Sequence, residues 1–319
     1  MSLISLLIAL AAERYLSSPV WQFNFYYQHY LKFFSRLPFS KSSPENNLSN
    51  TDDNSTETSS NSHITVKNVA FIAIPVFACY FLLDLLDDGL LNLIASTMVL
   101  IVCFGCIHTR NCYKQYLLAA FRGETTTCEM HHLQLLQDKN LMNMGFGQSL
   151  VWLNYRYFIA IMIFFVLFGA PGALAYRLLT KMTEPNNNAQ DKAAANESDI
   201  MEIENSDKNE SENIKASSQR IMSEQVLFWL DWLPVRAVAF CYMLVGHFSK
   251  AMPVWLENLF NVDKLPHVFL VDVAQKSEDF MIDAGDCTAE PCLLVRLAKR
   301  TLLLCLAVIA ILILTGVLS

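Results

Sequence analysis

Charged residues are scarce in this sequence: Asp, Glu, Lys and Arg make up 17% of its 319 residues, whereas soluble domains carry about 25%. Two polar stretches, 41–63 and 181–225, hold many of these charges, so the remaining chain is poorer still. A basic excess is also missing, because the net charge is −7, and this excludes a nucleic-acid footprint. With 53% hydrophobic residues, these absences exclude a water-soluble globule and a disulfide scaffold and predict a polytopic membrane protein.

The short motifs of common enzymes are missing as well. The chain has no GxxxxGKS/T phosphate loop, no GxGxxG turn, no GxSxG elbow and no HExxH motif. Cys103 and Cys106 have CxxC spacing, but they fall in an apolar run, where cysteine packs as a small apolar residue. Glu129, His131 and His132 contain possible metal ligands, but no second cluster completes a set. We therefore expect no metal site and no cofactor.

Long apolar runs without charges are the main feature that is present. Such runs cover 89–107, 157–176 and 301–318, and each approaches the ~20 residues that cross the hydrocarbon layer. A shorter run, 69–83, contains a proline and leads through a group of aspartates into the next run, which predicts a transmembrane hairpin over 67–108. A buried core helix would explain one such run, but four of them in a short chain predict membrane spans.

Two further segments bring the expected number of spans to six. Segment 2–12 is apolar but short, and it lacks the basic start and the cleavage pattern of a signal peptide, so we expect an uncleaved first helix. Segment 226–248 carries Asp231 and Arg236; a central charge costs ~2.5–3.5 kcal/mol in lipid, so this helix should face partners or water inside the bundle. The sequence predicts an all-α fold: a polytopic membrane helical bundle of about six transmembrane helices with short amphipathic cytoplasmic helices.

Apolar and polar stretches together divide the chain into nine segments. They are a short N-terminal helix with an aromatic segment (1–40), a disordered polar linker (41–66), the transmembrane hairpin (67–108), a cytoplasmic helical loop (109–156), a transmembrane helix (157–180), an acidic disordered loop (181–225), a polar transmembrane helix (226–248), a cytoplasmic loop (249–299) and a C-terminal transmembrane helix (300–319). The two linkers are rich in Asn, Ser, Asp and Glu, and such a composition buries too little apolar surface to repay chain ordering.

The distribution of Lys and Arg predicts the orientation. These residues gather in the loops 17–68, 108–156 and 249–300, which the positive-inside rule places in the cytoplasm. The acidic stretch 181–225 and both termini then lie on the opposite side. If the helix at 2–12 rests in the interface instead, the N-terminus stays inside.

One polar constellation is the candidate functional site. Asn154 and Arg156 lead into the helix FGAPGALAYR, whose small residues allow close helix packing and whose last residue is Arg177. Ionisable residues inside a membrane usually face a cavity, so we expect Asp231 and Arg236 to converge with Arg177 inside the bundle. The full cluster, read as a ligand-binding site or as a structural ion pair, is Asn154, Arg156, Arg177, Asp231, Pro234, Arg236 and His247.

Five motifs carry a family resemblance: LLIALAAERYL (6–16), YLLAAFRGE (116–124), VWLNYRYF (151–158), FGAPGALAYRLL (168–179) and LDWLPVRAVAFCYMLVGHF (230–248). On these motifs the chain resembles the AmpE family of inner-membrane proteins, a distant relative of cobalamin-biosynthesis membrane proteins. The resemblance implies a multi-pass regulatory modulator of the bacterial inner membrane, linked to β-lactamase induction and cell-wall recycling. The implied partners are the lipid bilayer and components of recycling or induction.

Two other functions stay open. One is a transporter of a polar solute with Asp231, Arg236 and Arg177 along its path, although the sequence has no visible internal repeat. The other is a membrane amide ligase similar to adenosylcobinamide-phosphate synthase, although the inner loops offer only scattered acidic residues for Mg²⁺-nucleotide. We therefore favour a regulatory protein over an enzyme.

Overall fold

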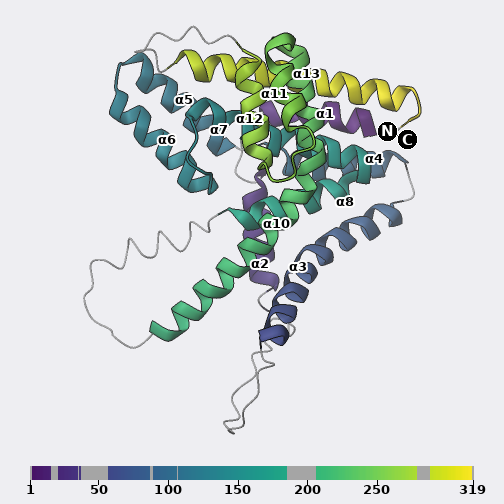
Figure 1. The fold of residues 1–319 in the computed structure, drawn as a ribbon. Helices are drawn as coiled ribbons and strands as arrows, with labels where there is room; N and C mark the ends of the chain where they lie inside the picture. Colours follow the sequence, from purple (N-terminus) through teal and green to yellow (C-terminus); the bar gives the residue numbers. More distant parts are fainter. Residues whose placement is uncertain are drawn as a thin grey trace.

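The structure, a computed structural model, describes residues 2–15, 21–34, 36, 57–86, 89–105, 107–184, 206–278 and 288–317. Every regular element in these ranges is helical, which confirms the predicted all-α membrane bundle. In chain order the helices are α1 (Ser2–Tyr15), α2 (Phe23–Phe34), α3 (Glu57–Leu85), α4 (Gly89–Cys103), α5 (Ile107–Phe121), α6 (Thr125–Lys139), α7 (Phe146–Asn154), the π-helix η3 (Tyr155–Ile159), α8 (Ala160–Thr183), α10 (Ser206–Val245), α11 (Phe248–Asn258), α12 (Pro266–Lys276) and α13 (Ala289–Leu314) (Figure 1).

Fewer helices are long enough to span a membrane than the six expected. In the described ranges, three stretches have the length and hydropathy of a span: Phe146–Thr183, Ile221–Val245 and Ala289–Leu314. α4 and α5, which meet at an angle of 42°, form a fourth if the pair is one broken span. Leu3–Glu13 and Val69–Leu85 are helical and apolar, but at 1.5 Å per residue they reach only about 17 Å and 26 Å. Instead of six, three or four stretches of the described residues thus have the length and hydropathy of a span, together with two shorter apolar helices.

The longest apolar stretch folds back on itself at Gly169. The backbone there has φ 72° and ψ −164°, a conformation that residues with a Cβ atom rarely adopt. Beyond the turn, the rings of Phe164 and Tyr176 stack with their centroids 4.7 Å apart, whereas twelve residues of continuous helix measure about 18 Å. α8 is therefore a helical hairpin, and its two arms lie against each other.

α10 is the centre of the packing. It contacts α8, α12 and α13, while α4 packs against α1 and α8. In Figure 1 the first part of α10 and the start of α3 project away from this bundle, and the start of α1 and the end of α13 lie at one side of it. The largest fully buried side chains include four tyrosines on η3, α8 and α10: Tyr155, Tyr157, Tyr176 and Tyr242. The core therefore holds hydroxyl groups that need polar partners.

Both expected linkers are partly helical. Residues 57–66 belong to α3 and residues 206–225 belong to α10. A helix nucleated in an apolar segment extends readily into neighbouring polar residues, since each added residue gains a backbone hydrogen bond. The remaining parts of the linkers, 41–56 and 185–205, lie outside the described residues.

The expected cytoplasmic loop at 109–156 is shorter than its predicted bounds. α5 and α6 supply its short helices, but the loop ends at 145, because α7 and η3 continue directly into α8. The hydrophobic pattern missed this continuation because Asn154 and Arg156 interrupt the uncharged run. The expected loop 249–299 also contains a helix, α12. It begins at Pro266, and proline suits the first turn of a helix because the backbone N–H there needs no partner within the helix.

The fold-back also changes the predicted orientation of the acidic stretch 181–225. Lys139 forms an ion pair with Glu184, with Nζ and Oε1 3.2 Å apart. Asn140 donates from Nδ2 to the Thr183 carbonyl and to Oε1 of Glu224, each at 3.4 Å. Both described ends of the stretch thus lie at the end of α6. The predicted position on the opposite side from α6 depended on a straight span over 157–180, which the turn at Gly169 replaces.

Candidate functional site

Asp231 is the centre of a buried polar group on α10. Only 2% of the surface of Asp231 is exposed. Oδ1 accepts hydrogen bonds from the hydroxyls of Tyr155 and Tyr176, at 2.8 Å and 2.9 Å. The first tyrosine comes from η3 and the second from the returning arm of α8, so the hairpin is what brings the two hydroxyls to one carboxylate. Hydrogen bonds to a charged acceptor are among the stronger ones in proteins.

Arg156 supplies the positive charge next to this carboxylate. It lies close to Asp231 and to the Tyr176 hydroxyl, and its guanidinium is 5.3 Å from the centre of the Trp152 ring. Its Nε atom is buried and has no hydrogen-bond partner within the described part of the chain. We call Tyr155, Arg156, Tyr176 and Asp231 the Asp231 cluster.

Two tyrosines of the π-helix η3 donate to different carboxylates. Tyr155, Arg156 and Tyr157 are the first residues of η3, where the chain carries one extra residue in the turn. Tyr155 donates to Asp231, while Tyr157 donates to Glu184 at the end of α8. Such π-turns are frequent at functional sites, because they present side chains that a regular helix would direct elsewhere.

A cavity of about 330 Å³ opens beside the Asp231 cluster. Arg156 and Asp231 line it together with Glu224 of α10 and His267 of α12. The imidazole of His267 meets the Trp152 ring edge-on, with centroids 5.7 Å apart. Burial, and secondarily the charge of Arg156, lower the pKa of His267 below its usual value of 6.5, so this ring is neutral at neutral pH. The charged groups at this cavity are therefore one cation and two carboxylates.

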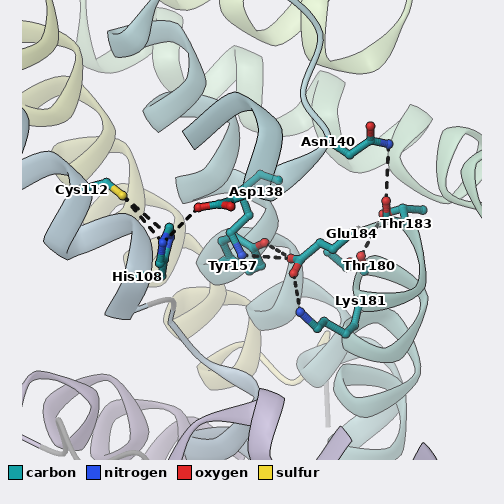
Figure 2. A network of polar contacts seen from close by, with 10 residues as sticks. His108, Cys112, Asp138, Asn140, Tyr157, Thr180, Lys181, Thr183 and Glu184 are labelled. Atoms are coloured by element: carbon teal, nitrogen blue, oxygen red, sulfur yellow. Dashed lines mark hydrogen bonds and ion pairs between the residues drawn. The ribbon is translucent and has the colours of Figure 1, made fainter. Parts of the chain in front are cut away.

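A second buried network, which we call the Glu184 cluster, consists of Tyr157, Lys181 and Glu184, which Figure 2 labels, and of Lys139, which pairs with Glu184. Nζ of Lys181 lies 2.8 Å from Oε2 of Glu184, while Lys139 and the Tyr157 hydroxyl both reach Oε1. Burial would raise the pKa of the Glu184 carboxyl, but Lys139, Lys181 and then Arg177 hold it well below its usual range. Glu184 is thus a fixed anion that ties the hairpin to α6.

A smaller cavity of about 230 Å³ lies beside the Glu184 cluster. At its edge, Nε2 of His108 lies 3.1 Å from Oδ2 of Asp138, and Sγ of Cys112 lies 3.8 Å from Nδ1 of the same ring (Figure 2). These contacts link the start of α5 to the end of α6. In the described residues no group of three or more His, Cys, Asp or Glu side chains is arranged to hold a metal ion.

Arg236 does not meet Asp231, contrary to the expected convergence. Its guanidinium donates to the carbonyls of Leu259, Trp232 and Asn261, at 2.6, 2.8 and 2.7 Å. It also lies 4.0 Å from the centre of the Trp232 ring. Two of these carbonyls follow the end of α11, where the helix dipole favours a cation. The side chain therefore joins α10 to α11 instead of forming the predicted ion pair.

The other predicted site residues are spread over the bundle. Arg177 lies over the Tyr157 ring, with the guanidinium 4.3 Å from its centroid, and so belongs to the surroundings of Glu184. Asn154 donates to the Ala298 carbonyl at 3.4 Å, and His247 precedes α11 with its backbone N–H bonded to the Ser277 carbonyl at 2.7 Å. Pro234 is buried within α10. Of the seven predicted residues, the structure brings only Asp231 and Arg156 together at one cavity.

Three important residues are not among the seven predicted site residues, although Tyr155 lies in the segment that carries Asn154 and Arg156. Tyr155 and Tyr176 hold Asp231, and Glu184 is the centre of the second network. A signal for the tyrosines existed, since each stands directly beside an arginine in an otherwise apolar segment. Glu184 had no such signal, because it reads as the first acidic residue of a polar stretch.

The fold and its two buried charge networks define a polytopic, all-helical membrane protein. A family model described as "Regulatory signalling modulator protein AmpE" matches residues 54–184 and 211–319. "Protein AmpE" from Shigella flexneri is 26% identical over 256 residues, which cover 75% of this chain and 81% of that relative. The chain belongs to the AmpE family, and the family description supports a regulatory role in a membrane. No solved structure matches the chain.

Proposed function

We propose that the protein is a regulatory modulator of the bacterial inner membrane that acts in β-lactamase induction and cell-wall recycling, and that the Asp231 cluster is its sensing site. The family description supports the regulatory role. The observation that carries the sensing role is the buried Asp231 carboxylate, held by two tyrosine hydroxyls beside a cavity that Arg156 also lines. Ionisable groups inside a membrane are costly and are typical of functional sites.

The position of this site explains how it can transmit a signal. The hairpin, α10 and α12 meet at the cavity, so a ligand that binds there contacts three elements at once. A ligand shifts a conformational equilibrium only when it binds one arrangement better than the other. A site between the hairpin, α10 and α12 offers such a difference, because a movement of one of these elements changes the width of the cavity and so the affinity for the ligand.

Asp231→Asn tests this function. Asparagine keeps the shape and still accepts both tyrosine hydrogen bonds, but it removes the negative charge beside Arg156, so protein level and membrane insertion are measured alongside induction. In a host that lacks its own AmpE but has an inducible β-lactamase, we expect the variant to fail to restore normal induction by a β-lactam. The matched control is Asp272→Asn, which removes a half-exposed carboxylate paired with Lys264 at 2.7 Å. Wild-type induction by Asp231→Asn at normal protein levels would argue against the sensing role.

Transport of a polar solute is the second candidate. The fold-back at Gly169 favours it, because discontinuous helices line the solute sites of many transporters. Uptake of a labelled solute by proteoliposomes distinguishes transport from sensing. A sensor binds its ligand to saturation at one ligand per protein, whereas a transporter accumulates many turnovers.

A further inference from the structure

The charges at the cavity beside the Asp231 cluster are separated along α10. Glu224 and Asp231 are seven residues apart, which is close to two helical turns, so both lie on the same face of the helix. Their separation along the axis is about 10 Å. Arg156 stands at the Asp231 end, and Glu224 stands at the other end with Asn140.

The cationic end can accept an anionic ligand group. Asp231 accepts from two tyrosine hydroxyls, while Arg156 lines the cavity with a side chain that is only partly buried. A guanidinium has five N–H donors in a fixed fork that matches a carboxylate. The Arg156 guanidinium lies 5.3 Å from the centre of the Trp152 ring.

The opposite end can accept a cationic ligand group. Glu224 is exposed at the rim, and its contact with Asn140, at 3.4 Å, leaves acceptor positions on the carboxylate. The wall between the two ends is mostly apolar: Leu141, Met142, Met144, Leu227, Phe228 and Leu265. A ligand that fits has charges of opposite sign at its two ends and an apolar middle.

We propose that this cavity binds a short peptide of two or three residues, with its carboxylate on Arg156 and its free ammonium group on Glu224. An extended peptide spans about 3.3–3.6 Å per residue, so two or three residues cover the distance of about 10 Å together with the flanking hydrogen bonds. This assignment rests on the proposed function in one respect, since it names the ligand class of the sensing site.

The experiment uses the full-length protein in lipid nanodiscs and isothermal titration calorimetry. The probes are alanyl-leucyl-alanine, its C-terminal amide, its N-acetyl form and free leucine. Each modified tripeptide lacks one terminal charge and therefore one charge-assisted contact. We expect the unmodified tripeptide to bind at least about tenfold more tightly than either modified form, and free leucine to bind more weakly than all of them because it spans only one end.

Two variants test which end of the cavity binds which terminal group of the peptide. Glu224→Gln changes an exposed side chain, so it should fold, and it should bind the tripeptide and its N-acetyl form equally. Arg156→Gln should bind the tripeptide and its amide equally. Lys264→Gln, which lies outside the cavity lining, is the matched control and should bind all probes as the wild type does.

The outcomes separate this inference from the proposed function. Equal binding of all tripeptides, or no binding of any, overturns the peptide assignment even if Asp231→Asn abolishes induction. Preference for a free carboxylate with no preference for a free ammonium group also overturns it, because the site would then be a simple anion site. Selective peptide binding together with normal induction by Asp231→Asn would instead contradict the sensing role alone.

Discussion

Glu184 and Asp231 are both buried carboxylates positioned by the same helical hairpin, but their neighbours differ. Glu184 receives direct ion pairs from Lys139 and Lys181, so its negative charge is compensated inside the network. Asp231 accepts from two neutral hydroxyls, and its positive neighbour Arg156 lines a cavity. The Glu184 carboxylate is closed off by direct ion pairs, whereas the Asp231 carboxylate is held by neutral donors, and a cavity borders each network.

This difference separates stability from binding. Removing one partner of a buried ion pair leaves an uncompensated charge, which is strongly destabilising. Removing a neutral donor from a shared carboxylate costs much less, because the second donor remains. We therefore expect changes in the Glu184 cluster to lower the free energy of unfolding, and changes in the Asp231 cluster to alter ligand binding more than stability.

The largest expected effect is that of Glu184→Gln. The glutamine cannot neutralise Lys139 and Lys181, which are only 9% and 17% exposed, so the variant should lose about 3–5 kcal/mol of stability. Thermal unfolding in detergent measures this loss. Glu224→Gln is the control, since it removes an exposed carboxylate at the same end of the bundle and should change stability by less than about 0.5 kcal/mol. Equal effects of the two substitutions would contradict a closed ion network.

Acid should weaken the Glu184 cluster selectively. The pKa of Glu184 is lowered in the folded state from its ordinary value of 4.5, so its stabilisation is fully present above pH 4.5. As the pH falls below that value the unfolded chain binds the proton first, and stability is lost by up to about 1.4 kcal/mol per pH unit. The stability difference between wild type and Glu184→Gln, measured from pH 6 to pH 3, should therefore shrink. A difference that stays constant or grows toward low pH would show that this pKa is not lowered.

Gly169→Ala tests whether the hairpin positions both clusters. A Cβ atom at this position would meet only Cδ of Pro171, at 3.6 Å, so the penalty comes from the backbone conformation rather than from a clash. The expected loss is about 1–3 kcal/mol, and tripeptide binding should weaken as well, because Tyr176 follows the turn. Gly89→Ala is the matched control, because its Cβ atom would have no neighbour within 4 Å. Wild-type stability of Gly169→Ala would mean that the turn tolerates an ordinary residue.

The helices were predictable from the sequence, because uncharged apolar runs need internally bonded backbone in a membrane. Each of the six predicted segments contains a helix within its described residues. The fold-back was not predictable from the same pattern, because FGAPGALAYR reads equally well as a smooth packing face on a straight helix. Its turn depends on one residue, Gly169, whose positive φ leaves no mark in hydropathy. The side on which the described ends of the stretch 181–225 lie was missed for this reason, whereas the number of spans was missed because Leu3–Glu13 and Val69–Leu85 are short.

The candidate site was predictable in part. Charged residues in an apolar segment pointed to Asp231 and Arg156, which do share a cavity. The partner of Arg236 was not predictable, since the carbonyls of Leu259 and Asn261 become acceptors only through the packing of α11 on α10. Backbone acceptors have no signature in the side-chain sequence, so an arginine that binds them looks like one in need of a carboxylate.

The smallest expected effects on stability are those of Tyr155→Phe and Tyr176→Phe. Both hydroxyls donate to the same oxygen of Asp231, so either one alone still satisfies it, and each substitution should cost about 1 kcal/mol. The double variant leaves that oxygen without a hydroxyl donor and should lose more than the sum of the single losses, which a double-mutant cycle of thermal unfolding measures. Tyr242→Phe, at a fully buried tyrosine of α10, is the control, and its stability loss should be additive with that of either substitution. Strict additivity of Tyr155→Phe and Tyr176→Phe would mean that the two hydroxyls do not share the carboxylate. Asp231 would then lack the two-donor support that distinguishes it from Glu184.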